Sequence, residues 1–198
     1  GLFLQPMSEA NGWGRDVFSM ALAIQNLSWG VIAVLAGGLA DRYGSAKVLL
    51  AGVVLYAVGM FAMAYSTTEW QIITTAGLMV GAGISGTAFG IILPLIARAV
   101  PKDKRTWAMG IGTAAGSSGQ FLLVPVMQEV IQMAGWFHAL QYLGLSALAM
   151  AALIIPLMPY SKVEQSSEPK VEGSMLHILL RALKVRSYTL LVLGFFVC

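Results

Sequence analysis

The sequence Gly37-Gly-Leu-Ala-Asp-Arg-Tyr-Gly44 carries the charges that separate two long apolar runs. The run before Asp41 has no charged residue over 17–40, and the run after Lys47 has none over 48–68. A helix needs roughly 20 residues to cross the hydrocarbon core of a bilayer, so each run is long enough to span it. Because a helix satisfies its own backbone hydrogen bonds in lipid, the segment predicts a turn between two membrane-spanning helices.

Three further charge-free runs have the same character, and they cover residues 70–97, 106–128 and 130–161. Of the 198 residues of the chain, 58% are hydrophobic and 11% are charged, whereas typical soluble domains are about 45–50% apolar and about 25% charged. This balance disfavours a soluble enzyme, a nucleic-acid-binding domain and a disordered protein. The sequence predicts an all-α membrane protein with five complete spans.

Two incomplete apolar runs flank these five spans. Residues 1–6 are typical of the end of a helix, and residues 187–198 are typical of the start of another. We therefore expect an internal fragment, in which a helical bundle over residues 1–158 begins with a truncated first helix. The start of a second, carboxy-terminal bundle is expected at residues 188–198.

The segment 159–187 should connect the two bundles. Its first part is polar and has no apolar period, which indicates a flexible linker. Residues 175–186 have basic residues on one side of a helix and leucines on the other, which predicts an amphipathic helix. A helix of this kind either lies on the membrane surface or serves as a regulatory target for a partner.

The basic residues gather in alternate loops. Of the 12 lysines and arginines, 11 lie in the segments 40–47, 98–106 and 159–187, and Arg15 alone lies on the opposite side. Loops rich in lysine and arginine stay in the cytoplasm. We therefore expect a multi-pass protein of the plasma (inner) membrane with these three segments on the cytoplasmic side.

The residue types of the first charged turn suit a tight connection between helices. Gly37 lets helix backbones approach closely, and Gly44 can adopt the left-handed conformation that ends a helix. Ser45 is expected to cap the following helix. The Asp41 carboxylate is expected to accept hydrogen bonds from the N-terminus of a neighbouring helix, and Arg42 should anchor the turn at the membrane interface.

The pattern Gly-x-Leu-Ala-Asp-Arg-x-Gly over residues 37–44 closely resembles the signature loop of the major facilitator superfamily, and it lies between the second and third spans as it does in that family. Ser45-Ala46 stands where the family usually has a basic pair, and Lys47 follows one position later. The resemblance extends along the chain. Gly12-Trp-Gly-Arg15 and Gly194-Phe-Phe-Val-Cys198 are similar to a bacterial branch that resembles the monocarboxylate porters.

This resemblance implies a fold of twelve helices in two halves, of which the chain would supply the six-helix amino-terminal half and the start of the seventh helix. It also implies rocker-switch alternating access around a site in the middle of the membrane. The residues that match the signature loop would then form a cytoplasmic gate that closes against the missing carboxy-terminal half, and they are Gly37, Asp41, Arg42 and Gly44.

Polar side chains near the middle of a span are candidates for a solute site because they are costly to place in lipid. The candidates are Gln25, Asn26 and Trp29 in the second span and Gln120 in the fifth. For Asn26 and Gln120, a hydrogen bond between helices is the alternative. Hydroxyl groups such as that of Ser85 can instead bond to their own helix.

Glycines spaced four residues apart recur in the spans, a pattern that favours close helix packing and also suits flexibility during gating. The pairs are Gly77 and Gly81, Gly86 and Gly90, and Gly112 and Gly116.

The sequence indicates no enzyme, cofactor or metal site. The two histidines, His138 and His177, lie in different loops, and no phosphate-binding loop or catalytic triad is present. His138 could sense pH or could have a structural role at the membrane interface. No aspartate, glutamate, lysine or arginine lies in the middle of a complete span. A group that carries a coupling proton, or a cation that binds an anionic solute, would therefore have to lie elsewhere.

Together with the resemblance, these features predict a secondary active transporter of a small organic solute. A monocarboxylate or similar organic anion is the expected substrate, on the resemblance alone. A drug or sugar carrier is the alternative within transport, although Pro125 follows Val124 and not the glycine typical of drug/proton antiporters. A membrane protein for signalling or assembly is the alternative outside it. The expected partners are the solute, the lipid bilayer and the missing half, and a coupling proton is left open.

Overall fold

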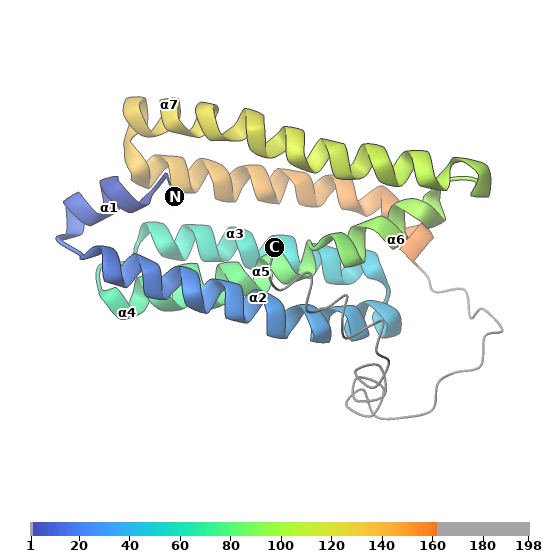
Figure 1. Cartoon of the computed structure of the whole chain (residues 1–198), viewed down its shortest axis with the longest axis horizontal. Helices are drawn as coiled ribbons and strands as arrows, with labels where there is room; N and C mark the ends of the chain where they lie inside the picture. Colours follow the sequence, from blue (N-terminus) through green and yellow to red (C-terminus); the bar gives the residue numbers. More distant parts are fainter. Residues whose placement is uncertain (1, 162–198) are drawn as a thin grey trace, which may run out of the picture. The chain divides into compact units, whose positions relative to one another are not determined.

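The computed structural model describes residues 2–161, and all regular elements among them are helical (Figure 1). The expected all-α membrane fold is confirmed. The elements follow one another as α1 Leu4–Asn11, α2 Arg15–Tyr43, α3 Ser45–Ala64, α4 Glu69–Ile72, the π-helix η1 Ile73–Met79, α5 Val80–Gly86, α6 Phe89–Ala99, the 3₁₀ turn η2 Lys102–Lys104, α7 Arg105–Ile154 and the 3₁₀ helix η3 Ile155–Ser161.

Four helical stretches of the described residues are long and apolar enough to cross a membrane. They are Arg15–Tyr43, Ser45–Ala64, Glu69–Ala99 and Lys102–Ile154. The last stretch contains Gly135, whose φ of 81° and ψ of 164° interrupt the helix. Figure 1 shows that the chain reverses there, so that α7 consists of two antiparallel legs, residues 105–134 and 136–154.

The structure refines one predicted boundary and corrects another. Glu129 separates the charge-free runs 106–128 and 130–161, but the chain reverses at Gly135, close to His138 at the expected membrane interface, because only glycine readily adopts such a backbone conformation. The first helix is expected to end within residues 1–6, whereas α1 extends to Asn11. It ends at Gly12, whose positive φ of 70° lets its N–H donate to the Ser8 carbonyl at 2.9 Å. The predicted segments 175–186 and 188–198, and 159–187 from residue 162 onward, lie outside the described residues.

Helix α5 packs closely against two neighbours through glycines on two of its faces. A methyl group added at Gly81 would lie 2.7 Å from the Gln25 carbonyl oxygen of α2. On the other face, a methyl group at Gly86 would lie 2.7 Å from the Cα of Gly52 in α3. The buried Ser85 hydroxyl lies 3.0 Å from the carbonyl oxygens of both Trp29 and Gly81. This interaction adds a polar link between α5 and α2.

The glycine pairs predicted from the sequence pack to different extents. Gly77 and Gly81 both face α2, which confirms close packing for this pair. Gly86 lies against α3, but Gly90 has no atom within 4 Å of an added methyl group. The third pair packs against side chains of α6, where Gly112 contacts Ile96 and Gly116 contacts Phe89.

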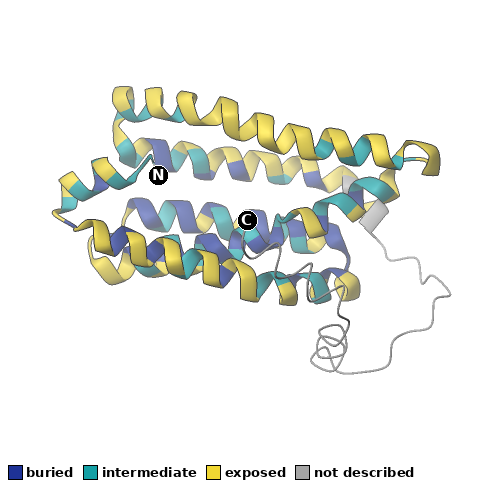
Figure 2. Ribbon diagram, in the orientation of Figure 1, coloured by how far each residue is buried: buried dark blue, intermediate teal, exposed yellow. Residues whose placement is uncertain are grey.

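Helix α3 has contacts with α2, α5, α6 and α7. Buried apolar side chains form one cluster toward each end of the bundle. Figure 2 shows that burial concentrates on α3 and α5, whereas the first leg of α7 is mostly exposed. Much of the surface of this leg is therefore left for lipid or for further protein.

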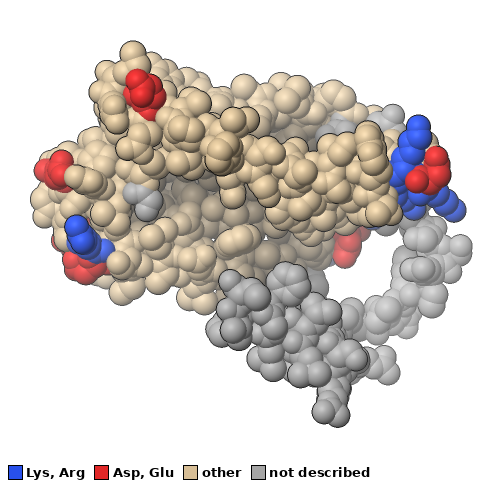
Figure 3. All heavy atoms as spheres, turned by 45° about the horizontal axis from the view of Figure 1, so that its top comes forward, with Lys and Arg blue, Asp and Glu red and all other residues tan. Residues whose placement is uncertain are grey.

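The charged residues of the described chain lie at the two ends of the bundle (Figure 3). One end carries the turns with Arg42, Lys47 and the cluster from Arg98 to Arg105. The opposite end has four acidic residues and one basic residue, namely Glu9, Asp16, Glu69, Glu129 and Arg15. The apolar middle and charged ends are those of a protein that spans a bilayer.

We predict that Gly86→Ala destabilises the bundle, because its methyl group would meet the backbone of Gly52 at 2.7 Å. Overpacking of this kind typically costs about 1–3 kcal/mol. The matched control is Gly90→Ala, where the methyl group has open space. Unfolding in dodecyl sulfate, followed by circular dichroism, measures both variants, and equal free energies of unfolding would contradict the close contact.

Candidate solute path and gate

One face of α2 carries small or polar residues at intervals of three or four positions. We call this face the α2 stripe, and its members are Ser19, Ala23, Asn26, Gly30, Ala33, Gly37 and Asp41. A methyl group added at Gly30 or Gly37 would meet no atom within 4 Å. The neighbouring faces expose large apolar side chains, such as Leu27 with 67% of its surface exposed. The stripe is therefore a narrow, small-residue and polar surface within an apolar one.

Asn26 lies in the middle of the α2 stripe and is exposed. Its Nδ2 donates to the carbonyl of Leu22 at 3.0 Å, within its own helix. Among residues 2–161, its side chain makes no hydrogen bond to another helix. The amide oxygen and the second N–H are available to a solute or to a further helix.

Gln25 lies about 100° around the helix from Asn26 and lines a different feature. This feature is a cavity of about 180 Å³ between the start of the chain, α2, α3 and the η1–α5 segment. Its lining is apolar except for Gln25, and consists of Leu2, Phe3, Leu4, Phe18, Ala21, Leu22, Gln25, Met60, Met63, Ala76 and Val80. A lining of this type suits the apolar part of a ligand, with the side-chain amide of Gln25 as the one hydrogen-bonding group.

The structure does not gather all four predicted solute-site residues. The cavity lined by Gln25 is not lined by any of the other three, Asn26, Trp29 and Gln120. Trp29 has 44% of its surface exposed, and its carbonyl, not its indole, accepts the hydrogen bond from Ser85. Gln120 is exposed on the first leg of α7. The candidates therefore divide between a cavity and two exposed helix surfaces.

The charged turn after α2 is built on Gly44, whose φ of 98° requires the conformational freedom of glycine. The Gly44 N–H donates to the Ala40 carbonyl at 2.9 Å, and Gly44 also precedes the first residue of α3. The expected cap by Ser45 is wrong: Ser45 is itself the first helical residue, and it is buried. A single glycine thus ends one helix and starts the next.

The other gate residues predicted in this turn are unpartnered or only locally held. Asp41 is exposed, and its carboxylate makes no hydrogen bond or ion pair within residues 2–161, so the expected link to a helix N-terminus is not formed here. The Arg42 guanidinium lies over the ring of Tyr43 at 5.4 Å. Gly37 has no close neighbour. The described bundle leaves this surface open.

Two features were not predicted from the sequence. The π-helix η1 interrupts the path from α4 to α5, and π-helices are frequent at functional sites. Within it, the Thr75 hydroxyl lies 2.7 Å from the Gln71 carbonyl and 3.2 Å from the Ser66 hydroxyl. The second feature is a polar pocket at the acidic end, between α1 and the first leg of α7. The spacing of Gln128 and Gln132, four residues apart, is the signal that could have indicated it.

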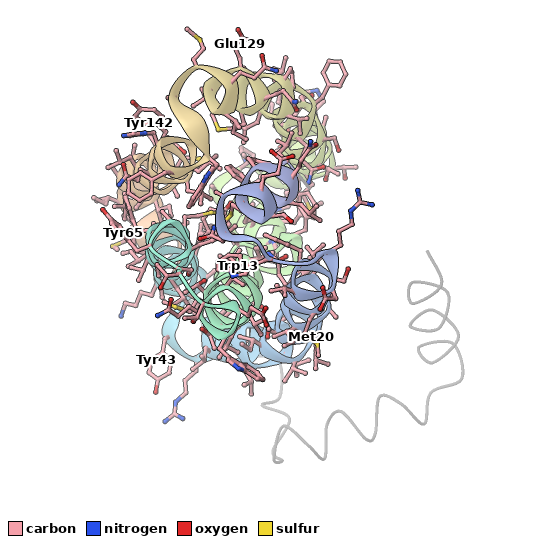
Figure 4. All side chains as sticks on the ribbon, turned by 90° about the vertical axis from the view of Figure 1, so that its left-hand side faces the viewer. Trp13, Met20, Tyr43, Tyr65, Glu129 and Tyr142 are labelled. Atoms are coloured by element: carbon pink, nitrogen blue, oxygen red, sulfur yellow. The ribbon has the colours of Figure 1, made fainter. Side chains whose placement is uncertain are left out.

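His138 lies at the start of the second leg of α7, in a group of aromatic residues. Its Nδ1 is 2.9 Å from the Ala134 carbonyl, and its ring meets that of Phe137 edge-on at 5.4 Å. The ring of Phe137 also meets that of Tyr65, with centroids 5.2 Å apart, and the Tyr65 hydroxyl accepts a hydrogen bond from Gln141. Figure 4 shows Tyr65 at the end of α3. These contacts join the end of α3 to α7 and favour the structural alternative for His138.

The membrane-length helices, the glycine contacts between them and the charged ends define a multi-pass α-helical membrane protein. The profile of the Major Facilitator Superfamily matches residues 1–198. The chain belongs to this superfamily, whose members are transporters.

Individual relatives are named for different roles. The chain is 26% identical over 158 residues to the uncharacterized MFS-type transporter YcxA of Bacillus subtilis, which covers 80% of this chain and 38% of the relative. It is 30% identical over 149 residues to the probable anion transporter 3 (chloroplastic) of Arabidopsis thaliana, covering 71% of this chain and 28% of that protein. It is 31% identical over 178 residues to the multidrug resistance protein MdtG of Citrobacter koseri, covering 86% and 39%. The chain thus spans less than half the length of each relative.

We predict that the α2 stripe is in contact with water when the protein is in a bilayer. In a Cys198→Ser background, Asn26→Cys and Gly30→Cys should react with a water-soluble maleimide at least about tenfold faster than Leu27→Cys, because the reactive thiolate forms only in a polar environment. Leu27 is the matched control because, like Asn26 and Gly30, it is exposed in the structure, but it lies beside the stripe. Faster reaction of Leu27→Cys would show that the stripe faces lipid.

Proposed function

We propose that the chain is the amino-terminal six-helix half of a secondary active transporter that moves a small organic solute by rocker-switch alternating access. The observation that carries this proposal is the family match over the whole chain. The open α2 stripe supports it, because small residues allow a second half to approach closely and then separate.

The proposed cellular location is the plasma (inner) membrane, with the basic end of the bundle in the cytoplasm. The turns with Arg42 and Lys47 and the cluster from Arg98 to Arg105 support this orientation, since lysine and arginine are retained on the cytoplasmic side. In this orientation Asp41 and Arg42 lie at the cytoplasmic end of the α2 stripe. We therefore place the gate there, with Gly37 and Gly44 as its close-packing and turn residues.

The proposed substrate is an organic anion such as a monocarboxylate, carried by a protein of the monocarboxylate-porter-like branch. The anion-transporter relative supports this class, and the multidrug relative supports a drug carrier as the alternative. The cavity beside Gln25 is apolar and has no cationic side chain in its lining. A cationic side chain that binds the anionic substrate would therefore come from residues outside 2–161.

Uptake by proteoliposomes tests the proposal. The protein encoded by the complete reading frame that contains this chain should take up a labelled monocarboxylate, and a panel with sugars and cationic drugs separates the alternatives. Uptake of only a sugar or a drug would overturn the substrate class. Absence of uptake for the whole panel, together with capture of a stable protein partner, would favour the signalling or assembly alternative.

We predict that Asn26→Leu impairs uptake because the solute or the second half loses its hydrogen bonds to this amide. A lost hydrogen bond costs about 0.5–1.5 kcal/mol, which corresponds to about a two- to tenfold increase in KM or decrease in rate. The matched control is Asn11→Leu, since Asn11 also donates to the carbonyl four residues before it at 3.0 Å but lies in α1. Unchanged KM and rate for Asn26→Leu would make this residue structural.

We predict that Asp41→Asn slows uptake by up to about tenfold but leaves the free energy of unfolding within about 0.5 kcal/mol of the original. The exposed carboxylate has no partner in the described bundle, so stability should not depend on it. A carboxylate near a helix N-terminus of the second half would contribute about 0.3–1 kcal/mol to the outward-open state, and up to about 2 kcal/mol if partly buried. Cysteine accessibility on both sides of the membrane measures the populations.

The control for this variant is Asp103→Asn, which removes another exposed carboxylate from the same end of the bundle. Equal rates and equal populations in Asp41→Asn and the original protein would remove Asp41 from the gate.

A further inference from the structure

The polar pocket at the acidic end has a volume of about 230 Å³. It is lined by Leu2, Gln5, Pro6 and Glu9 of the first segment and by Gln128, Ile131 and Gln132 of α7. Its four polar side chains form two pairs, each spaced four residues apart on a helix. Because residues four apart lie on the same face of a helix, each pair turns the same side of its helix to the pocket.

Glu9 is the single charged residue in this lining. One of its carboxylate oxygens accepts a hydrogen bond from Gln5 Nε2 at 3.1 Å, which orients the group. The carboxylate forms no ion pair within the part of the chain that the structure describes. Arg15 lines a neighbouring pocket of about 270 Å³ together with Glu9, yet no ion pair joins the two. The carboxylate is therefore available to a cation from outside the bundle.

The surroundings favour a cation as well. The acidic end of the described bundle has four carboxylates and one arginine, so its net charge is negative. A surface of one sign raises the local concentration of ions of the opposite sign. The carboxamide oxygens of Gln5, Gln128 and Gln132 add neutral acceptors around the charged one. The set offers one anionic and several neutral hydrogen-bond acceptors.

We propose that this pocket binds a primary ammonium group, with Glu9 as its counter-ion and the glutamine carboxamides as acceptors for the remaining N–H groups. A primary ammonium has three N–H donors, which match this set of acceptors. The volume is below the roughly 300–1,000 Å³ typical of sites for drug-sized ligands, and it suits a small head group. Such a group is present both in free amino alcohols and in the ethanolamine head group of a phospholipid.

Titration calorimetry on the 198-residue chain in phosphatidylcholine nanodiscs tests the chemistry. Ethanolamine should bind at least about tenfold more tightly than choline, because choline has the same charge but no N–H donor, and charge-assisted hydrogen bonds are the strong ones. Equal affinities for the two cations, or no binding of ethanolamine, would overturn the proposal.

Three variants test the residues. Glu9→Gln should weaken ethanolamine binding at least about tenfold, whereas the matched control Glu129→Gln should not change it. Glu129 carries the same charge, adjoins Gln128 in sequence and does not line the pocket, and Figure 4 shows it on the side of α7 away from α1. Gln132→Glu adds a second carboxylate to the lining and should strengthen binding. Equal losses in Glu9→Gln and Glu129→Gln would reduce the effect to the general field of the acidic end and overturn the site.

The source of the ammonium is determined by adding phosphatidylethanolamine to the nanodiscs. Weaker apparent binding of free ethanolamine by the original chain, but not by Glu9→Gln, identifies the lipid head group as the occupant. Unchanged binding identifies a free solute. Both results support an ammonium site, and neither depends on whether the protein transports a solute.

Discussion

The bundle depends on the close contact of α5 with both α2 and α3. Within a bilayer, apolar side chains gain little by leaving lipid, so helices associate through tight packing and through hydrogen bonds between them. Gly81 places α5 against the backbone of α2, and Gly86 places it against Gly52 of α3. Ser85 adds hydrogen bonds from the same helix. With α5 fixed on two sides, α2 is held at one face only, and its opposite face carries the stripe.

Most of the fold could be predicted from the sequence because membrane crossing depends on length and hydropathy. Charge-free runs identified the spans, and the glycine spacing predicted close packing at Gly77 and Gly81, whose partner the structure shows to be α2. The exact residues at which backbone conformation ends a helix were not predicted. The reversal at Gly135 carries no charge to mark it, and the nearest charged residue, Glu129, lies inside a helix. The π-helix at Ile73–Met79 was missed as well, because its residue types are also those of an ordinary helix.

The candidate site was less predictable, since polarity at the middle of a span does not tell which way a side chain points. Gln25 and Asn26 are adjacent in sequence, yet one lines an apolar cavity and the other lies on an open helix face. For Asp41, the sequence predicted the turn between α2 and α3. The hydrogen bonds expected from its carboxylate to a helix N-terminus are not formed among residues 2–161.

The distribution of charge limits how this bundle can act on a charged solute. Among residues 2–161, ionised groups lie only at the two ends, so a solute in the middle meets amides, hydroxyls and helix dipoles. Removing an ion from water without a fixed counter-charge is costly, and the amide of Gln25 or Asn26 alone is a weak replacement. If an anion crosses here, its counter-charge must be supplied by another part of the transporter. In that case this bundle would provide close packing and a movable surface, and the residues that select the charge of the solute would lie in another part of the protein.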